Sequence, residues 1–302
     1  MIINEANISS AFNGFKTVFQ AAFDGTETYA DKVSMRVPSA TREETYGWLG
    51  KFPKLREWIG DRVLNSLEAS SYAIKNKLFE STIEVSRTDF EDDQFGVLKP
   101  VVGEMGQNAK QHPDELIFSL LASGFSSLCY DGQNFFDADH PVLVNGEPVS
   151  ISNVQAGEDA AWYLLDTSRQ VKPVVFQERF PYNFQRLDQE NSDHVFLKDQ
   201  YLFGIRARAN VGFGLWQLAF ASKAPLNAEN YEAARQAMMS MRADNPANAG
   251  GQGRVLGVKP TLLVVPPQLE GAARTLLNAT VTNNDSNIWA GSAELIVTSY
   301  LL

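Results

Sequence analysis

The chain has 302 residues and a formal net charge of −10, from 26 basic and 36 acidic residues. Its length accommodates two domains, or one large domain with extensions, and its acidic balance argues against binding nucleic acid through a basic stripe. The single cysteine, Cys129, excludes an intrachain disulfide and is typical of a reducing cytosol. No basic residue precedes Lys16, and the uncharged run 116–130 is too short to cross a bilayer. We therefore expect a soluble cytosolic product without a membrane contact.

The first predicted element is a helix over residues 5–23, which ends before Gly25. Its apolar residues follow one helical stripe: Ile8, Ala11, Phe12, Phe15, Phe19 and Ala22. Two interpretations remain open, a helix packed on its own core and an arm that docks on a neighbouring subunit. The polar, threonine-rich segment 26–45 that follows the helix makes a detachable arm plausible. The helix residues Phe12, Phe15 and Phe19 are then candidate contacts between subunits.

Residues 72–93 form the second notable element, after tryptophan anchors at Trp48 and Trp58 and a short predicted strand at 62–68. Apolar and polar residues alternate along this segment, which predicts a strand that pairs with 62–68 as a hairpin. An isolated hairpin is marginal in water, so we expect this ribbon to lie on another copy of the chain. The candidate contacts are Tyr72, Ile74, Phe79, Ile83, Val85 and the terminal acids Glu91, Asp92 and Asp93.

The rest of the chain predicts a mixed α and β structure. Residues 96–131 indicate one long helix kinked at Pro113, or two helices end to end. Strands are predicted at 162–166 and 172–180, and the clearest one at 201–215, where every odd residue is apolar. After residue 225, helices and strands alternate in a pattern that is typical of a compact α/β module.

The densest polar group lies in the loop 130–141 and contains Asp131, Asp137, Asp139 and His140. Carboxylates and imidazole are metal ligands in principle, but the spacing fits no zinc or EF-hand pattern. We interpret the loop as turns capped by aspartates and anchored by phenylalanines. A metal-dependent hydrolase that uses the last three of these residues is the enzymatic alternative.

Other candidate chemistry is weaker. Cys129 has no recognisable histidine partner in the sequence, and the pair Gly212 and Gly214 lies inside a strand and lacks the third glycine of a dinucleotide fingerprint. Arg206 and Arg208 favour local ion pairs over phosphate binding on an acidic chain. We therefore predict no catalytic, cofactor-binding or metal-binding residues.

Several long segments resemble one known family, the major head subunits of Mu-like phages and prophages (gpT). They are TYGWLGKFPKLREWIG at 45–60, SYAIKNKLFESTIEVSRTDFEDD at 71–93 and CYDGQNFFDADHP at 129–141, followed by RARANVGFGLWQLA, MMSM, KPTLLVVPP and AELIVTSYL in the same order. The resemblance covers almost the whole chain, and motifs of more than ten residues make it specific.

The resemblance implies an α+β fold, the tailed-phage major capsid fold of the Hong Kong 97 type. In that fold an N-terminal arm, an extended β-hairpin loop, a long spine helix, a peripheral domain and an axial domain build hexamers and pentamers of an icosahedral shell. On this chain we expect the arm at 1–47, the extended loop at 48–95 and the axial α/β domain at 223–302. The peripheral domain at 96–222 would contain the spine helix (96–130) and the long strand (201–215).

The expected function is therefore a major capsid protein, not an enzyme, that self-assembles into the shell around phage DNA. Its expected partners are further copies of itself, scaffold, portal and other head proteins, with double-stranded DNA enclosed without sequence-specific binding. We expect it in the virion after assembly in the bacterial host cytoplasm. The alternatives are the hydrolase built on the 131–140 loop, and a minor head or scaffold protein, which would be more helical than residues 160–220 suggest.

Overall fold

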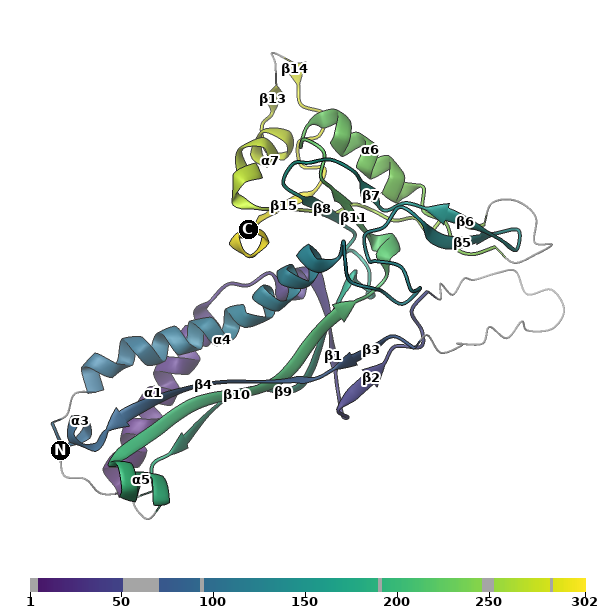
Figure 1. The fold of residues 1–302 in the computed structure, drawn as a ribbon. Coiled ribbons are helices and arrows are strands. Elements are labelled where there is room, and N and C mark those ends of the chain that lie inside the picture. The colour runs from purple at the N-terminus through teal and green to yellow at the C-terminus, as the bar shows by residue number, and fades with distance from the viewer. Residues whose placement is uncertain (1–4, 51–70, 93–94, 190–191, 246–252, 283–284) are drawn as a thin grey trace.

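The computed structural model describes residues 5–50, 71–92, 95–189, 192–245, 253–282 and 285–302. The chain forms an elongated part, which contains two long helices on a sheet, and a compact part built on a second sheet (Figure 1). The long helices are α1 (Glu5–Gly25) and α4 (Phe95–Ser123). Short helices α2 (Ala30–Val33), α3 (Arg87–Glu91) and α5 (Asp193–Lys198) join elements of the elongated part.

Within the described residues, the sheet of the elongated part has four strands in the order β1-β9-β10-β4. These are β1 (Ser34–Pro38), β9 (Val174–Leu187), β10 (Gln200–Phe213) and β4 (Lys77–Ser86). β9 and β10 form an antiparallel hairpin with α5 at its tip, β1 runs parallel to β9, and β4 runs antiparallel to β10. This hairpin runs along most of the elongated part (Figure 1).

The sheet of the compact part has the order β15-β12-β8-β11-β7 in the described chain. Its strands are β7 (Val154–Gln155), β8 (Trp162–Leu165), β11 (Ala219–Ser222), β12 (Leu262–Val265) and β15 (Glu294–Val297). Helices α6 (Ala228–Met239) and α7 (Glu270–Leu277) accompany it. Short strand pairs are β2 (Glu43–Thr45) with β3 (Ala73–Lys75), β5 (His140–Val144) with β6 (Glu147–Ile151), and β13 (Val281–Thr282) with β14 (Asp285–Ser286).

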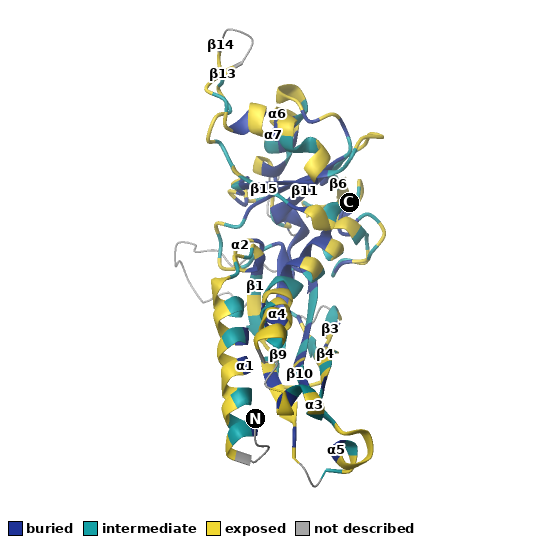
Figure 2. Cartoon of the chain, turned by 90° about the vertical axis from the view of Figure 1, so that its left-hand side faces the viewer, coloured by how far each residue is buried: buried dark blue, intermediate teal, exposed yellow. Residues whose placement is uncertain are grey.

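The alternation that predicted β10 is confirmed, because its odd residues from Tyr201 to Ala209 and Phe213 are buried. Tyr201, Phe203 and Ile205 belong to a core cluster shared with α1 and α4, in which the ring of Phe15 lies edge-on to Phe203 with centroids 5.3 Å apart, while Phe213 belongs to the second core cluster. The ring of Phe19 stacks on Phe184 of β9 at 5.1 Å. Of the two interpretations of the N-terminal helix, the structure therefore has the one in which it packs on its own core, and Figure 2 shows its buried side turned toward the sheet.

Two sequence predictions differ from the structure in the elongated part. The ribbon 72–93 does not project as a separate hairpin: residues 77–86 pair with β10 of the same chain, and 73–75 pair with β2. Strand periodicity reveals a strand but not its partner, which here is more than a hundred residues away. The predicted strand at 62–68 lies outside the described residues.

The predicted spine helix also ends earlier, at Ser123 instead of residue 130, and runs as one helix with Pro100 and Pro113 inside it. Gly124 follows directly, and its carbonyl accepts a hydrogen bond from the backbone N–H of Phe136. A Cβ at Gly124 would lie 2.7 Å from the Phe136 ring. The close approach of this loop to the helix end leaves no room for another helical turn.

The predicted boundary at residue 222 does not follow the sheets. β7, β8 and β11 precede it, yet they pair with each other and with β12 in the compact part. The residues of β8 and β11 are buried on both faces, so these short strands lack the alternation that would mark a sheet in the sequence. The compact sheet therefore includes residues 154–165 and 219–222, which we had assigned to the peripheral domain.

The aromatic core between α1 and the β9–β10 hairpin should dominate the stability of the elongated part. Replacing the fully buried Phe203 by alanine should lower the free energy of unfolding by about 3–5 kcal/mol, through lost burial and an unfilled cavity. Urea denaturation measures this change. The matched control is Phe196→Ala, at a side chain that is 83% exposed, which should stay within about 0.5 kcal/mol of the parent chain. Equal losses in the two variants would contradict this packing.

Candidate functional site

The loop that carried the candidate chemistry forms a buried polar cluster around His140, whose side chain is fully buried. His140 Nδ1 lies 2.8 Å from Asp131 Oδ2, and the Cys129 thiol donates to the other carboxylate oxygen at 3.0 Å. The imidazole stacks on the Trp216 ring, with centroids 3.9 Å apart and planes inclined by 8°. The cluster thus ties the loop after α4 to the turn that follows β10.

The second nitrogen of His140 faces Asn153. The Asn153 amide nitrogen donates to the carbonyls of Phe135 and Trp216, which orients its oxygen toward His140 Nε2 at 3.2 Å. Both ring nitrogens therefore face side-chain oxygen atoms. The pKa of Asp131 lies below its ordinary value: burial alone would raise it, but the hydrogen bonds from His140 and Cys129 lower it.

This arrangement supports a structural role more than a chemical one. Cys129, Asp131 and His140 offer three possible metal-ligand atoms within 4.8 Å of one another, but hydrogen bonds inside the cluster already engage these atoms. Burial raises the pKa of the Cys129 thiol, with Asp131 adding to the effect, so the thiol is a poor nucleophile. The remaining hydrolase candidates lie outside the cluster: Asp137 accepts from Asn134 and Ala138, and Asp139 is exposed.

A second feature is the neck, which consists of Tyr46 and Tyr72 and the contacts they make on either side of residues 47–71. Of that segment, residues 51–70 lie outside the described residues. The backbone N–H of Tyr46 donates to the Tyr72 carbonyl at 2.9 Å, next to the β2–β3 pair. The Tyr46 hydroxyl donates to the buried Gln177 side chain of β9 at 2.8 Å. The neck is therefore fixed to the long hairpin.

Neighbouring groups strengthen this neck. The amide of Gln177 donates to the Ile74 carbonyl and to Asn76. The Tyr72 hydroxyl accepts from the backbone N–H of Phe213 at 2.8 Å, and burial raises the pKa of Tyr72 to about 12. Each of these polar groups is satisfied within the chain, so the ends of the 47–71 segment are held in one geometry.

The predicted contact residues between subunits fall into two groups. Phe15, Phe19, Ile74 and Val85 are buried in the chain's own core, while Phe12, Tyr72, Phe79 and Ile83 are half-buried against it. These side chains already have apolar neighbours in their own chain. Glu91 and Asp92 are exposed, and Asp93 lies outside the described residues. Of the described candidates, these two acids are the exposed ones, and the Glu91 carboxylate already lies 3.7 Å from the Arg87 guanidinium.

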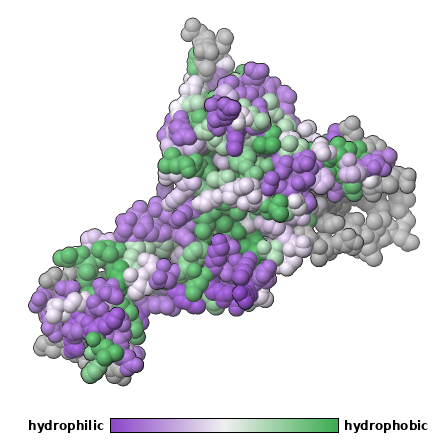
Figure 3. Space-filling view, viewed as in Figure 1, coloured by the Kyte–Doolittle hydropathy of each residue, from purple (hydrophilic) through white to green (hydrophobic). Residues whose placement is uncertain are grey.

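The sequence analysis missed several exposed apolar side chains at one end of the elongated part. Phe196 and Leu197 of α5 are 83% and 76% exposed, and Val97 and Val101 of α4 are 71% and 47% exposed. They lie at the end of the elongated part where α3, α5 and the start of α4 come together (Figure 1), which we call the distal end. Figure 3 shows hydrophobic surface there in two places separated by hydrophilic surface. The sequence could not reveal these side chains, because their exposure depends on where each short element packs.

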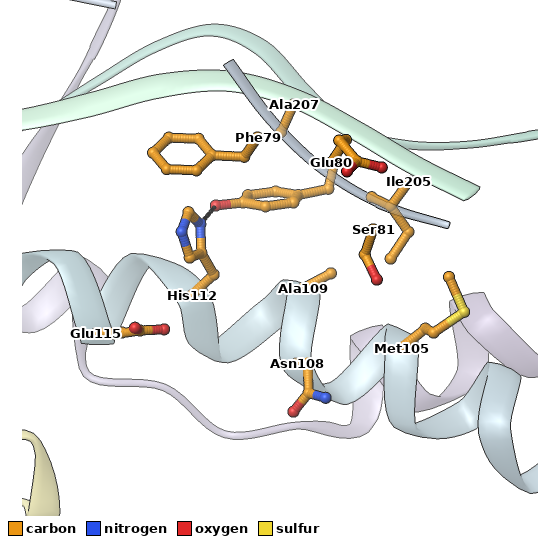
Figure 4. A pocket seen from close by; sticks show the side chains of 11 residues that line it. Phe79, Glu80, Ser81, Met105, Asn108, Ala109, His112, Glu115, Ile205 and Ala207 are labelled. Atoms are coloured by element: carbon orange, nitrogen blue, oxygen red, sulfur yellow. Dashed lines mark hydrogen bonds between the residues drawn. The ribbon is translucent and has the colours of Figure 1, made fainter. Parts of the chain in front are cut away.

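A cavity of about 240 Å³ lies between α4 and strands β4 and β10 (Figure 4). Its lining includes Phe79, Met105 and Ile205, and the His112 side chain bonds the Tyr182 hydroxyl at 2.5 Å. Burial lowers the pKa of His112. Since the histidine is held by a phenol and not paired with a nucleophile, the cavity favours packing over chemistry.

In the described part of the chain, we also find no helix with the length and apolarity needed to cross a membrane.

Comparisons with known proteins agree over the whole chain. The family model described as Mu-like prophage major head subunit gpT matches residues 8–301. The major capsid protein of Escherichia phage Mu is 43% identical over 312 residues, covering all of both chains, and the Mu-like prophage FluMu major head subunit of Haemophilus influenzae is 40% identical over 286 residues, covering 92% of this chain and 91% of the relative.

Solved structures give the same result. The chain is similar to a chain of the procapsid of bacteriophage JBD30, with a TM-score of 0.87 and 44% identity over 99% of this chain and 100% of the other. It is also similar to a chain of the bacteriophage JBD30 capsid, with a TM-score of 0.74 and 35% identity over all of both chains.

The His140 cluster should stabilise the fold in a pH-dependent way. Asp131→Asn should cost about 2–3 kcal/mol of unfolding free energy at pH 7, because it removes a charge-assisted acceptor. The folded pKa of Asp131 is lowered, so the ionised carboxylate stabilises the fold above its ordinary pKa of about 4, and this contribution is lost as the pH falls through the folded value. The difference between parent and variant should therefore shrink at pH 3.

Urea denaturation at pH 7 and pH 3 measures this difference. The control is Asp159→Asn, at an exposed carboxylate outside the cluster, and it should leave the stability at pH 7 unchanged. A difference between Asp131→Asn and the parent that is the same at both pH values would contradict the proposed ionic contribution.

Proposed function

The chain belongs to the family of Mu-like prophage major head subunits (gpT), and from this membership we propose how it builds a phage head. It is a major capsid protein, a structural protein and not an enzyme, with the tailed-phage major capsid fold of the Hong Kong 97 type. The observation that carries this conclusion is the TM-score of 0.87 to a procapsid chain over 99% of the sequence. The comparisons give no support to the hydrolase alternative.

Copies of the chain associate into a shell, and we take hexamers and pentamers as its units. The elongated part supports this arrangement, because a long flat body offers several separate edges to neighbouring copies, and stable protein contacts bury about 1,200–2,000 Å² each. The chain is then a component of the virion capsid, and it assembles in the host cytoplasm. Scaffold, portal and other head proteins are its further partners.

We propose an extended loop that is shorter than the predicted 48–95. The Tyr46–Tyr72 hydrogen bond closes its base, and residues 77–86 belong to the sheet, so the loop comprises the residues between the two tyrosines. A base fixed to β9 transmits force from a neighbouring subunit directly into the long hairpin. Within the expected arm at 1–47, the buried face of α1 belongs to the subunit's own core. The exposed face of α1 is therefore the one that contacts a neighbouring subunit.

The shell encloses double-stranded DNA without recognising its sequence. The net charge of −10 supports this part of the proposal, because an acidic protein repels phosphate and leaves packaged DNA free to move. Arg206, one of the two arginines singled out on β10, lies over the Phe180 ring at 5.8 Å. This local contact favours a structural role for the arginine.

Self-assembly is tested by expressing the chain alone at high concentration and sizing it by light scattering and negative-stain microscopy. We expect shells, tubes or rings of capsomer size. A chain that remains monomeric both alone and in the presence of the head proteins of a Mu-like phage would contradict the proposal.

The loop is tested by replacing residues 51–70 with a short glycine-serine linker. The neck contacts of Tyr46 and Tyr72 stay in place, so the subunit should keep the circular dichroism spectrum and melting temperature of the parent. Because the loop supplies contact with a neighbour, shell yield should fall at least about tenfold. Parent-like shells from this variant would contradict the role of the loop.

A further inference from the structure

Helix α4 takes part in two separate hydrophobic cores. Met105 and Ala109 lie in the core cluster shared with α1 and the β9–β10 hairpin, whereas Ile117 and Phe118 lie in the larger cluster that extends into the compact part. The short segment 110–116 therefore joins the two cores. A shift of α4 at this segment changes how the elongated part is held against the compact part.

The joining segment is restrained less tightly than the rest of the helix. Pro113 lies inside α4 and has no backbone N–H, so the helical hydrogen bond from this position to the Ala109 carbonyl is missing. Two cavities of about 240 and 340 Å³ flank the segment, and Ala109 and Tyr182 line both of them. Close packing therefore restrains α4 less here than in its apolar turns on either side.

One polar contact ties this segment to the sheet. His112 Nδ1 and the Tyr182 hydroxyl of β9 lie 2.5 Å apart and share a hydrogen bond (Figure 4). The His112 ring also meets the Phe79 ring of β4 edge-on, with centroids 4.3 Å apart. The residue directly before Pro113 thus contacts two strands of the sheet.

The surroundings of His112 favour the neutral imidazole. Burial lowers the pKa of His112, and the Glu115 carboxylate, one turn further along α4, opposes this effect only in part. In the described part of the chain, the hydrogen-bond partner of the ring is a phenol and not a carboxylate. The other groups around the two cavities have partners of their own or are apolar: Glu80 accepts from Thr82, Arg36 pairs with Glu178 and Asp31, Lys110 lies over the Phe23 ring, and β10 contributes Ile205 and Ala207.

We propose that the His112–Tyr182 contact is a proton-sensitive latch, which holds α4 against the sheet at neutral pH and releases it in acid. An imidazolium in the cavity lining has no bonded counter-ion. Water and the exposed Glu115 carboxylate, three residues along the same side of α4, stabilise the charged ring outside the cavity. Release frees α4 to shift at Pro113. The latch acts within one subunit, so its test does not depend on the proposed function.

The direction of the pH effect follows from the lowered pKa of His112. The neutral ring keeps the latch closed above the ordinary histidine pKa of about 6.5. Below that value, the released form takes up a proton more readily than the latched form, so the latch weakens as the pH falls. Because release binds one proton, the ratio of released to latched subunits rises by at most about tenfold per pH unit.

Hydrogen–deuterium exchange of the folded subunit at pH 7 and pH 5 tests the latch. After correction for intrinsic exchange rates, the amides of residues 109–116 in the parent should lose protection at least about threefold at pH 5, while those of β10 keep theirs. His112→Gln can still bond Tyr182 but cannot take up a proton, so its protection over 109–116 should be equal at both pH values. The control His194→Gln, on α5, should respond as the parent does. Equal pH responses of the parent and His112→Gln overturn the proposal.

A direct titration keeps the proposal testable even if His112→Gln does not fold. The chain has three histidines, and NMR of their rings in the parent measures the pKa of each one. The His112 ring should titrate below about 6.5, over the same pH range in which protection of residues 109–116 is lost. A His112 pKa at or above its ordinary value overturns the proposal, as does a loss of protection at a pH where the ring stays neutral.

Discussion

The antiparallel pairing of β9 with β10 is the constraint on which the rest of this subunit depends. Fourteen residues of each strand form a hairpin that supplies the apolar face for α1 and α4 and the edge on which β4 pairs. Its tip carries α5, and its other end leads into the His140 cluster through Trp216. A long hairpin alone is marginal in water, so the aromatic contacts of Phe184 and Phe203 with α1 also stabilise the hairpin itself.

The same hairpin connects the neck of the proposed extended loop to the distal end. Gln177, buried on β9, bonds the neck of the extended loop on one side of the body, while the distal end displays its apolar patches about one hairpin length away. This arrangement suits a shell protein, whose function is mechanical and whose buried polar groups serve to fix geometry.

The candidate chemistry of the sequence is explained by the same requirement. Cys129, Asp131 and His140 come together because the loop after α4 must close on the turn after β10, and the polar atoms that are buried there need partners. The sequence identified Asp131 and His140 as a polar constellation and assigned them to turns. It could not pair them with Trp216 and Asn153, since those contacts join residues that only the folded loops bring together.

The sequence by itself determined the strand β10, the helical character of 5–23 and 96–123, and the family, because these depend on local periodicity and on long motifs. The tertiary structure alone decided that residues 77–86 pair with β10, that β7, β8 and β11 join the compact sheet, and that Phe196 and Leu197 stay outside. Strand pairing and exposure are set by contacts between distant residues. A period of two shows which side chains share a face of a strand, but not what lies against that face.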